Sequence, residues 1–521
     1  MLSSVNPNDN MAAVRLLDFF ASHVPWHRSL WGVGTILAME ELHEGCSMLR
    51  QGHLSKASIE RMSSALLKRV GNHPAFEAEE KQFLRQQIAQ IPRAEGAAHH
   101  GLKQLATRAS SDYLDRWARV VATGKYPMEL FARSVAAHLL DAGFSEQHLH
   151  DLVKNHLNST QPISLAELCE ALQAELIQEP KREFEVLVAF SKAPSFPNRV
   201  PNHWLQATAI PQWLTANGFA TSGVRAQVAT LLTVHARDYL GAAKAAWDEH
   251  ERHSARALLS TGKPLSVVPT LWVKGAGQPS LKKEAFRGVS VKELFRGDRI
   301  FSNDANQSVD AALELLAHLE SSSAPAAIAG GWAAIEGLLA DPSDRASAAD
   351  NLAALVACSL PRAELTALAH RAIKDHPVVC AHLSQAQNNR ERSRQLAQMI
   401  AANFLPPMTG LSDQAAVKRL KKLLLNPQLE LAIIKDSIAD SFHRLYRQRN
   451  LILHGGRLDG VALTASLRTV AKLAGAGMDR ITHGHYVQGL RPLELVARAN
   501  LSLALANASR PEDCADLLEN T

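Results

Sequence analysis

Residues 428–456 read QLELAIIKDSIADSFHRLYRQRNLILHGG. Apolar residues recur along this stretch in steps of three and four, which predicts one long amphipathic helix from Gln428 to His454. Gly455 and Gly456 predict the end of that helix, because glycine readily adopts the left-handed conformation that follows a helix C-terminus. With Ala and Leu abundant and aromatic residues at only 5%, the chain is expected to be mainly α-helical.

One arginine lies on the apolar stripe of this predicted helix. The stripe consists of seven residues: Leu431, Ile434, Ile438, Phe442, Leu445, Arg449 and Ile452. A guanidinium among buried apolar side chains is costly unless it pairs with a carboxylate or contacts an anion. Tyr446, Asn450 and His454 share a neighbouring column of the helix, at spacings of four and eight. We therefore expect Arg449, Asn450 and His454 to form one polar site at the end of the helix.

The same stretch carries an excess of positive charge. Between Asp440 and Asp459 it has six basic side chains and no carboxylate: His443, Arg444, Arg447, Arg449, His454 and Arg457. Such a patch suits the phosphodiester backbone of RNA. In metal-free RNA cleavage the 2′-hydroxyl attacks the adjacent phosphorus, a histidine transfers the proton and an arginine holds the phosphate. The residues predicted to contact RNA around this centre are Tyr446, Arg444, Arg447 and Arg457.

The spacing of an arginine, four residues and a histidine is weak on its own. It occurs twice more, at Arg133–His138 and at Arg371–His376. Neither arginine is followed by an asparagine, and the second pair contains Asp375 and runs into Pro377. We therefore predict that both of these pairs are structural.

The flanking residues give a resemblance to a known family. Five residues match the Arg-Asn-x-x-x-His signature of the HEPN superfamily and are similar to its ApeA-like branch: Tyr446, Arg449, Asn450, His454 and Gly455. Residues 332–339, WAAIEGLL, are similar to the first-helix motif of that branch. The resemblance covers about residues 305–508, and nothing in residues 1–300 extends it.

The resemblance implies an all-helical domain that pairs with a second copy and brings two Arg449 and His454 sets into one cleft. Many such proteins are endoribonucleases of phage defence, toxin–antitoxin or RNA-processing systems that need no metal or other cofactor. Carried over to this chain, Arg449 and His454 would be catalytic, and Asn450 would orient them. The long interval between the two matched stretches, with Pro361 and Pro377 inside it, departs from a minimal four-helix version.

Two other interpretations stay open. In the first, the domain is a non-catalytic module that holds RNA or a nucleotide in the same basic cleft, and the N-terminal region recruits a regulatory protein. In the second, the domain is a helical scaffold in which Arg449 pairs with Glu336. The position of Glu336 supports this pairing, since it shares a stripe with three apolar residues: Trp332, Ile335 and Leu339.

The pattern of elements predicts three domains. Residues 1–178 read as consecutive amphipathic helices, and residues 179–300 as a small α+β domain with a connector. Residues 301–521 read as the HEPN-like helical bundle, in which one helix is expected at 346–358. The upstream 300 residues carry no comparable chemistry, so we expect them to sense a trigger or to restrain the nuclease.

The predicted α+β domain is marked by a change of period near residue 180. Short branched apolar runs predict strands at 184–190 and 228–234, and a helical pattern follows at 239–259. A third strand is expected at 266–273. It should lie at an edge of the sheet, because Pro269 has no N–H to donate to a second neighbour.

Composition limits the setting of the protein. The net charge of +5 permits an anionic partner without requiring one. The five cysteines are odd in number and widely separated, which predicts neither a disulfide framework nor a zinc site. The N-terminus lacks the pattern of a signal peptide, and no uninterrupted apolar run reaches about 20 residues. We therefore expect a cytoplasmic protein that does not enter a membrane.

Overall fold

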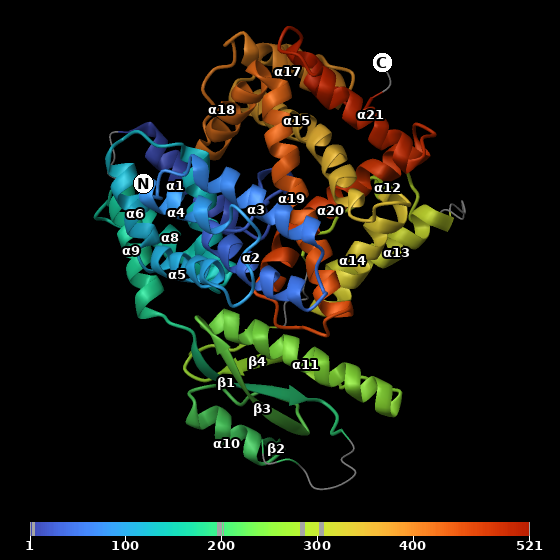
Figure 1. Ribbon diagram of the computed structural model, residues 1–521. Coiled ribbons are helices and arrows are strands. Elements are labelled where there is room, and N and C mark those ends of the chain that lie inside the picture. The colour runs from blue at the N-terminus through green and yellow to red at the C-terminus, as the bar shows by residue number, and fades with distance from the viewer. Residues whose placement is uncertain are drawn as a thin grey trace. The chain divides into compact units, whose positions relative to one another are not determined.

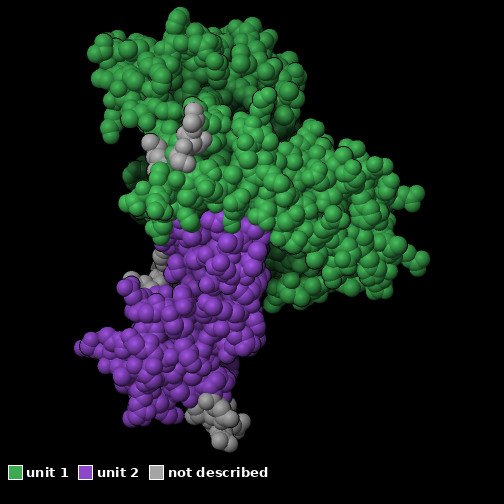
Figure 2. Space-filling model, turned by 90° about the vertical axis from the view of Figure 1, so that its left-hand side faces the viewer, with its two compact units in different colours: residues 1–138, 153–170, 287–521 green, residues 139–152, 171–286 purple. Residues whose placement is uncertain are grey.

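The computed structural model describes residues 2, 6–194, 201, 203–281, 287–301 and 307–519. The chain is mainly α-helical, as the sequence predicts (Figure 1). It divides into two compact units, which Figure 2 shows in green and purple. Unit 1 comprises residues 1–138, 153–170 and 287–521, and unit 2 comprises residues 139–152 and 171–286.

The predicted N-terminal helices are present. They are α1 (Pro7–Phe20), η1 (Trp26–Arg28), α2 (Thr35–Arg50), α3 (Lys56–Gly71), α4 (Ala78–Gln87), α5 (Ala97–Ser111), α6 (Tyr113–Ala122), α7 (Met128–Asp141), α8 (Glu146–Leu157) and α9 (Leu165–Gln178). Asn6 caps α1 and Ser55 caps α3, each through a side-chain oxygen that accepts a backbone N–H of the first turn.

Unit 2 is built on an antiparallel sheet with the order β2-β3-β1-β4-β5. Its elements are β1 (Arg182–Phe190), β2 (Trp204–Gln206), α10 (Ala209–Ala216), β3 (Val228–Ala236), α11 (Tyr239–Thr261), β4 (Val267–Val273) and β5 (Ser280–Leu281). Alternate side chains of β1 face opposite sides of the sheet, and these sides are covered by α11 and α10. The strands predicted at 184–190 and 228–234 are confirmed.

The third predicted strand is present as β4, but its predicted edge position is wrong. Strand β5 pairs with β4 at Thr270 and Leu271. The paired residues of β4 both follow Pro269, so the pairing with β5 does not need the N–H that the proline lacks. The expectation failed because a two-residue partner strand leaves too short a pattern to detect in the sequence.

The C-terminal part of unit 1 is a bundle around one apolar core. Its helices are α12 (Glu293–Arg296), α13 (Gln307–Ser321), α14 (Ala324–Leu339), α15 (Ser347–Asp375), α16 (Ala381–Gln385), α17 (Asn389–Ala401), α18 (Leu411–Leu425), α19 (Pro427–Leu453), α20 (Leu463–Tyr486), α21 (Pro492–Leu505) and η2 (Pro511–Ala515). Helix α19 contacts α14, α15, α18, α20 and α21. Its predicted stripe is confirmed, since Leu431, Ile438, Phe442 and Leu445 are fully buried.

Helix α15 is longer than the sequence pattern predicts. A helix was expected at 346–358, but the observed helix continues through Pro361 to Asp375. A proline inside a helix costs about 3 kcal/mol. Beyond the proline, Leu365 and Leu368 are fully buried, and such a leucine contributes about 1.5–3 kcal/mol. The core therefore offsets the cost of the proline.

Within the described ranges, α15 is also the one helix long and apolar enough to cross a bilayer. Of its most apolar 18-residue window, 72% is buried in the structure. A core helix of a soluble protein has this combination of composition and burial, so the structure is consistent with a soluble chain.

Residues 1–138 and 287–521 belong to one compact unit, although the sequence divided them into separate domains. Buried ion pairs join the two segments. Arg28 Nε lies 2.6 Å from Glu364 Oε1 of α15, and Arg28 Nη1 lies 2.8 Å from Asp413 Oδ1 of α18. Breaking a buried pair leaves an uncompensated charge, which is strongly destabilising, so these contacts hold the segments together.

His27 adjoins this network and is uncharged at neutral pH. Burial lowers its pKa to about 4, opposed by Glu364 and assisted by Arg28, Arg419 and Lys292. Neither ring nitrogen has a hydrogen-bond partner among the described residues. As the pH falls below about 6.5 the unfolded chain binds a proton at this histidine, whereas the folded chain does not until about pH 4. His27 therefore lowers the free energy of unfolding across that interval.

We expect the free energy of unfolding of His27→Leu to depend less on pH than that of the wild type. Relative to the wild type, the variant should gain up to about 1.4 kcal/mol of unfolding free energy for each pH unit between about 6.5 and 4. Urea unfolding at several pH values measures the difference. The matched control is His100→Leu at an exposed histidine, which should keep the wild-type slope. Parallel pH curves for His27→Leu and the wild type would contradict the assignment.

Candidate functional site

The polar stretch lies at the end of α19, as predicted. The helix ends at Leu453, and His454 is the C-cap residue, whose N–H donates to the carbonyl of Asn450 at 2.9 Å. The left-handed conformation belongs to Gly456, with φ of 61°. Gly455 is constrained differently, because a Cβ there would lie 2.7 Å from the carbonyl oxygen of Leu451.

The three residues predicted to form the site are in contact. Arg449 Nη1 donates to Asn450 Oδ1 at 3.0 Å and lies 3.3 Å from His454 Nε2. Asn450 is buried, Arg449 is half-buried and His454 is exposed. Since a guanidinium only donates, Nε2 accepts here, which corresponds to a neutral imidazole with its proton on Nδ1. An exposed imidazole in this form can take a proton from a ligand.

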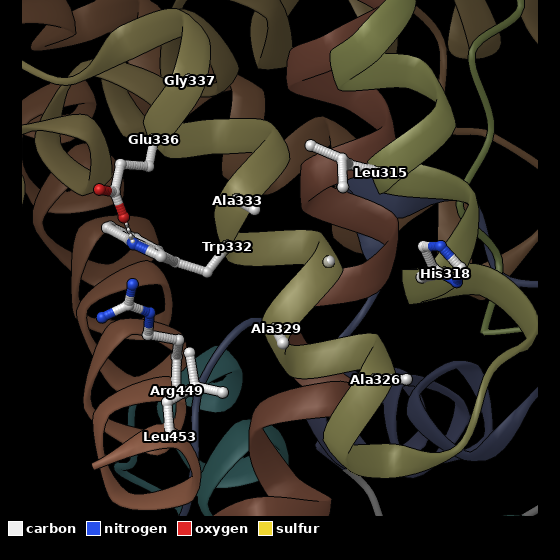
Figure 3. Close-up of a pocket in the computed structure, with 11 residues that line it drawn as sticks. Leu315, His318, Ala326, Ala329, Trp332, Ala333, Glu336, Gly337, Arg449 and Leu453 are labelled. Atoms are coloured by element: carbon white, nitrogen blue, oxygen red, sulfur yellow. Dashed lines mark hydrogen bonds between the residues drawn. The ribbon is translucent and has the colours of Figure 1, made fainter. Parts of the chain in front are cut away.

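A pocket of about 560 Å³ opens beside Arg449. Helix α14 forms its floor with small residues, and α13 and α19 form its walls (Figure 3). The lining residues are Leu315, His318, Ala326, Ala329, Gly330, Trp332, Ala333, Glu336, Gly337, Arg449 and Leu453. Figure 3 shows the guanidinium of Arg449 directed toward the Trp332 indole and the Glu336 carboxylate. The pocket thus combines an apolar surface with one guanidinium, from Arg449, and one carboxylate, from Glu336.

Among the described residues, Glu336 forms no ion pair with Arg449. Its carboxylate accepts a hydrogen bond from Trp332 Nε1 and lies 3.5 Å from Arg345 Nε. Among the described residues, the hydrogen bonds and ion pairs of Arg449 include no carboxylate. The predicted Glu336–Arg449 pair is therefore absent from the described part of the chain, and the guanidinium is available to an anion in the pocket.

The other two arginine–histidine pairs are structural, as predicted. Arg133 Nε lies 2.7 Å from Glu129, and His138 is buried. Arg371 Nη1 lies 2.8 Å from Asp413, and His376 Nε2 donates to a backbone carbonyl at 2.9 Å. In both pairs a carboxylate neutralises the arginine. Pairing with a carboxylate distinguishes Arg133 and Arg371 from Arg449, whereas the spacing from arginine to histidine does not.

Arg444 and Arg447 do not lie where RNA could reach them, contrary to the prediction. They are 3% and 5% exposed, and both bind the buried carboxylate of Glu41 on α2. Burial would raise the pKa of Glu41, but the two guanidiniums outweigh it and lower that pKa to about 2. This partner could not be predicted from local patterns, because Glu41 lies 403 residues before Arg444.

The remaining predicted RNA contacts are also engaged within the protein. Arg457 Nε lies 2.9 Å from Asp459, and Arg457 Nη2 lies 3.4 Å from Glu44. The half-buried ring of Tyr446 packs on Trp332 with ring centroids 4.8 Å apart. Tyr446 thus supports the pocket wall. The positive patch expected from the local sequence is largely compensated, because carboxylates from other elements enter it.

We expect Gly455→Ala to disturb the turn that carries His454. The new methyl group would meet the Leu451 carbonyl and, at 3.4 Å, the His53 ring, so the turn must shift. Overpacking of this kind typically costs about 1–3 kcal/mol, measurable by urea unfolding. The control is Gly456→Asn, because asparagine tolerates the left-handed conformation and no atom lies within 4 Å of a Cβ there. Equal losses in the two variants would contradict the steric argument.

Comparison with protein-family models, curated proteins and solved structures finds no match to this chain. Within the described residues, no group of three or more His, Cys, Asp or Glu side chains could hold a metal ion. The site is therefore defined by its own geometry: Arg449 lines a pocket and contacts Asn450 and His454.

Proposed function

We propose that this protein is a metal-independent endoribonuclease of the HEPN type. One observation carries the proposal: Arg449 faces a pocket, has no carboxylate partner among the described residues and lies 3.3 Å from the exposed imidazole of His454. A phosphate is the anion that this combination suits, because a guanidinium can hold two phosphate oxygens while a neighbouring imidazole moves a proton.

In the proposed reaction, the scissile phosphate takes the place of His454 Nε2 as the partner of the Arg449 guanidinium. His454 Nε2 accepts the proton of the 2′-hydroxyl as its oxygen attacks phosphorus. The bond from phosphorus to the 5′-oxygen breaks, and the 5′-oxygen takes a proton from a second acid. The products are a 2′,3′-cyclic phosphate and a 5′-hydroxyl. Arg449 stabilises the charge that develops on the phosphate oxygens.

Asn450 supports the role of Arg449 in this scheme. Its buried amide oxygen accepts a hydrogen bond from Arg449 Nη1, so the guanidinium is held from behind. Holding a flexible side chain in its working orientation before the substrate binds lowers the entropic cost of reaction. Asn450 is therefore proposed as an orienting residue and not as a proton carrier.

The wider setting is proposed from the family resemblance. A homodimer through the C-terminal domain would bring a second His454 to the cleft, where it could protonate the leaving 5′-oxygen. The proposal includes a cytoplasmic effector of phage defence or of a toxin-like system, in which a regulatory protein could bind the N-terminal region. The positive net charge of +5 is compatible with RNA as the partner.

A second candidate function is a non-catalytic module that binds RNA or a nucleotide. The pocket supports this function, since a volume of about 560 Å³ and a mostly apolar lining with a few charged groups, here Arg449 and Glu336, are usual for a small-molecule site. In this case Arg449 would hold a phosphate and the pocket would hold the attached nucleoside, without cleavage.

Labelled RNA incubated with the purified full chain in EDTA distinguishes the two functions. We expect cleavage to 2′,3′-cyclic phosphate ends, and a loss of about 10²–10⁴-fold in rate for His454→Ala with binding retained. Arg449→Ala should lose both cleavage and part of the binding. The matched control is His376→Ala, which removes a histidine at the same spacing from an arginine and should keep full activity. Tight binding with intact RNA would support the module instead.

A further inference from the structure

Helix α19 presents two different polar faces near its C-terminal end. Arg444 and Arg447 are three residues apart and share one face, which meets α2. Arg449 follows Arg447 by two residues, a rotation of about 200° around the helix, and lines the pocket above α14. The direction in which Arg449 points therefore depends on how α19 is rotated against α2.

One carboxylate sets that rotation. Glu41 Oε2 accepts from Arg444 Nε at 2.9 Å, and Glu41 Oε1 accepts from Arg447 Nε at 3.1 Å and from Arg447 Nη2 at 2.7 Å. All three side chains are at least 94% buried, with side-chain exposures of 4%, 6% and 5%. Each oxygen of Glu41 thus serves a different guanidinium. A turn of α19 about its axis would break at least one of these bonds between nearly buried groups.

The turn after His454 rests on the same part of α2 and the residues that follow it. Glu44 accepts the backbone N–H of Val461 at 3.3 Å and lies 3.4 Å from Arg457. The ring of His53 lies against Gly455, at 3.4 Å from the position of a Cβ. The segment that carries the imidazole is therefore contacted by His53 near its start and by Glu44 of α2 near its end.

The pocket itself receives nothing from these helices. Every residue that lines it comes from α13, α14 or α19. The contacts of α2 and α3 with α19 lie on the opposite face, and Figure 1 shows α2, α3 and α19 side by side. In this arrangement α2 and α3 support the site from behind and do not close it.

We propose that Glu41 is a positioning residue, which fixes the C-terminal end of α19 and thereby the orientation of Arg449 and His454. The N-terminal helices α2 and α3 then act as a support that the site requires, and a partner that drew α2 away would switch the site off. The structural part of this inference stands on the contacts alone, and only its effect on cleavage rests on the proposed function.

Hydrogen–deuterium exchange of the full-length Glu41→Gln variant tests the structural part. The variant leaves two buried guanidiniums without a negative partner, so the end of α19 should loosen. We expect the amides of residues 450–457 to exchange at least tenfold faster than in the wild type, while those of α14 and α15 change less than twofold. A uniform acceleration throughout unit 1 would mean that Glu41 only stabilises the fold, and would overturn the proposal.

The effect on catalysis is measured at saturating RNA under conditions where the variant remains folded by circular dichroism. For Glu41→Gln we expect kcat to fall at least tenfold and KM to change less than threefold. Glu41→Asp keeps the charge and should recover part of kcat. An increase in kcat, or unchanged exchange and unchanged kcat, would overturn the proposal. If RNA is not cleaved even by the wild type, the proposed function fails while the exchange result still decides the role of Glu41.

The control variant is Lys68→Ala. Lys68 on α3 pairs with Asp436 of α19 at 3.1 Å across the same interface, but the two side chains are 75% and 66% exposed. An exposed pair contributes little, so neither exchange at residues 450–457 nor kcat should change more than twofold. A loss in Lys68→Ala equal to that in Glu41→Gln would show that any weakening of the interface suffices, and would remove the specific role of Glu41.

Discussion

The buried carboxylate of Glu41 between Arg444 and Arg447 is the constraint on which the geometry of the site depends. Three nearly buried ionised groups are stable only when each keeps its partners, because desolvation of a charge is costly. The position and rotation of α19 are therefore defined more sharply by this cluster than by its apolar stripe, since apolar contacts have no direction. Because Arg449 lies on the same continuous helix as Arg444 and Arg447, its orientation follows from theirs.

Charge compensation also separates the candidate site from its surroundings. Arg133 and Arg371 each meet a carboxylate, as do Arg444, Arg447 and Arg457. Arg449 bonds instead to an amide and an imidazole. In a protein that pairs so many of its arginines with carboxylates, a guanidinium that lines a pocket and has no carboxylate partner among the described residues is a candidate site for an anion.

The sequence patterns predicted the features that depend only on residues close together in the chain. The length of α19, its apolar stripe and the contact of Arg449 with Asn450 and His454 all follow from residues within one helix and were anticipated. The partners of Arg444 and Arg447 were not, because Glu41 is brought to them by the tertiary fold from 403 and 406 residues away. The continuation of α15 through Pro361 was missed for the same reason, since only burial in the assembled core offsets the cost of the proline.

The Glu41 cluster and the pocket lie on two different faces of α19. A helix can carry a reactive group into a pocket only if something on its other side resists rotation, and apolar packing alone permits small slips of one helix against another. The cluster around Glu41 supplies that resistance within the last three turns of α19, close to Arg449 and the turn of His454. The N-terminal helices thus have a physical reason to belong to the same compact unit as the bundle, although none of their residues lines the pocket.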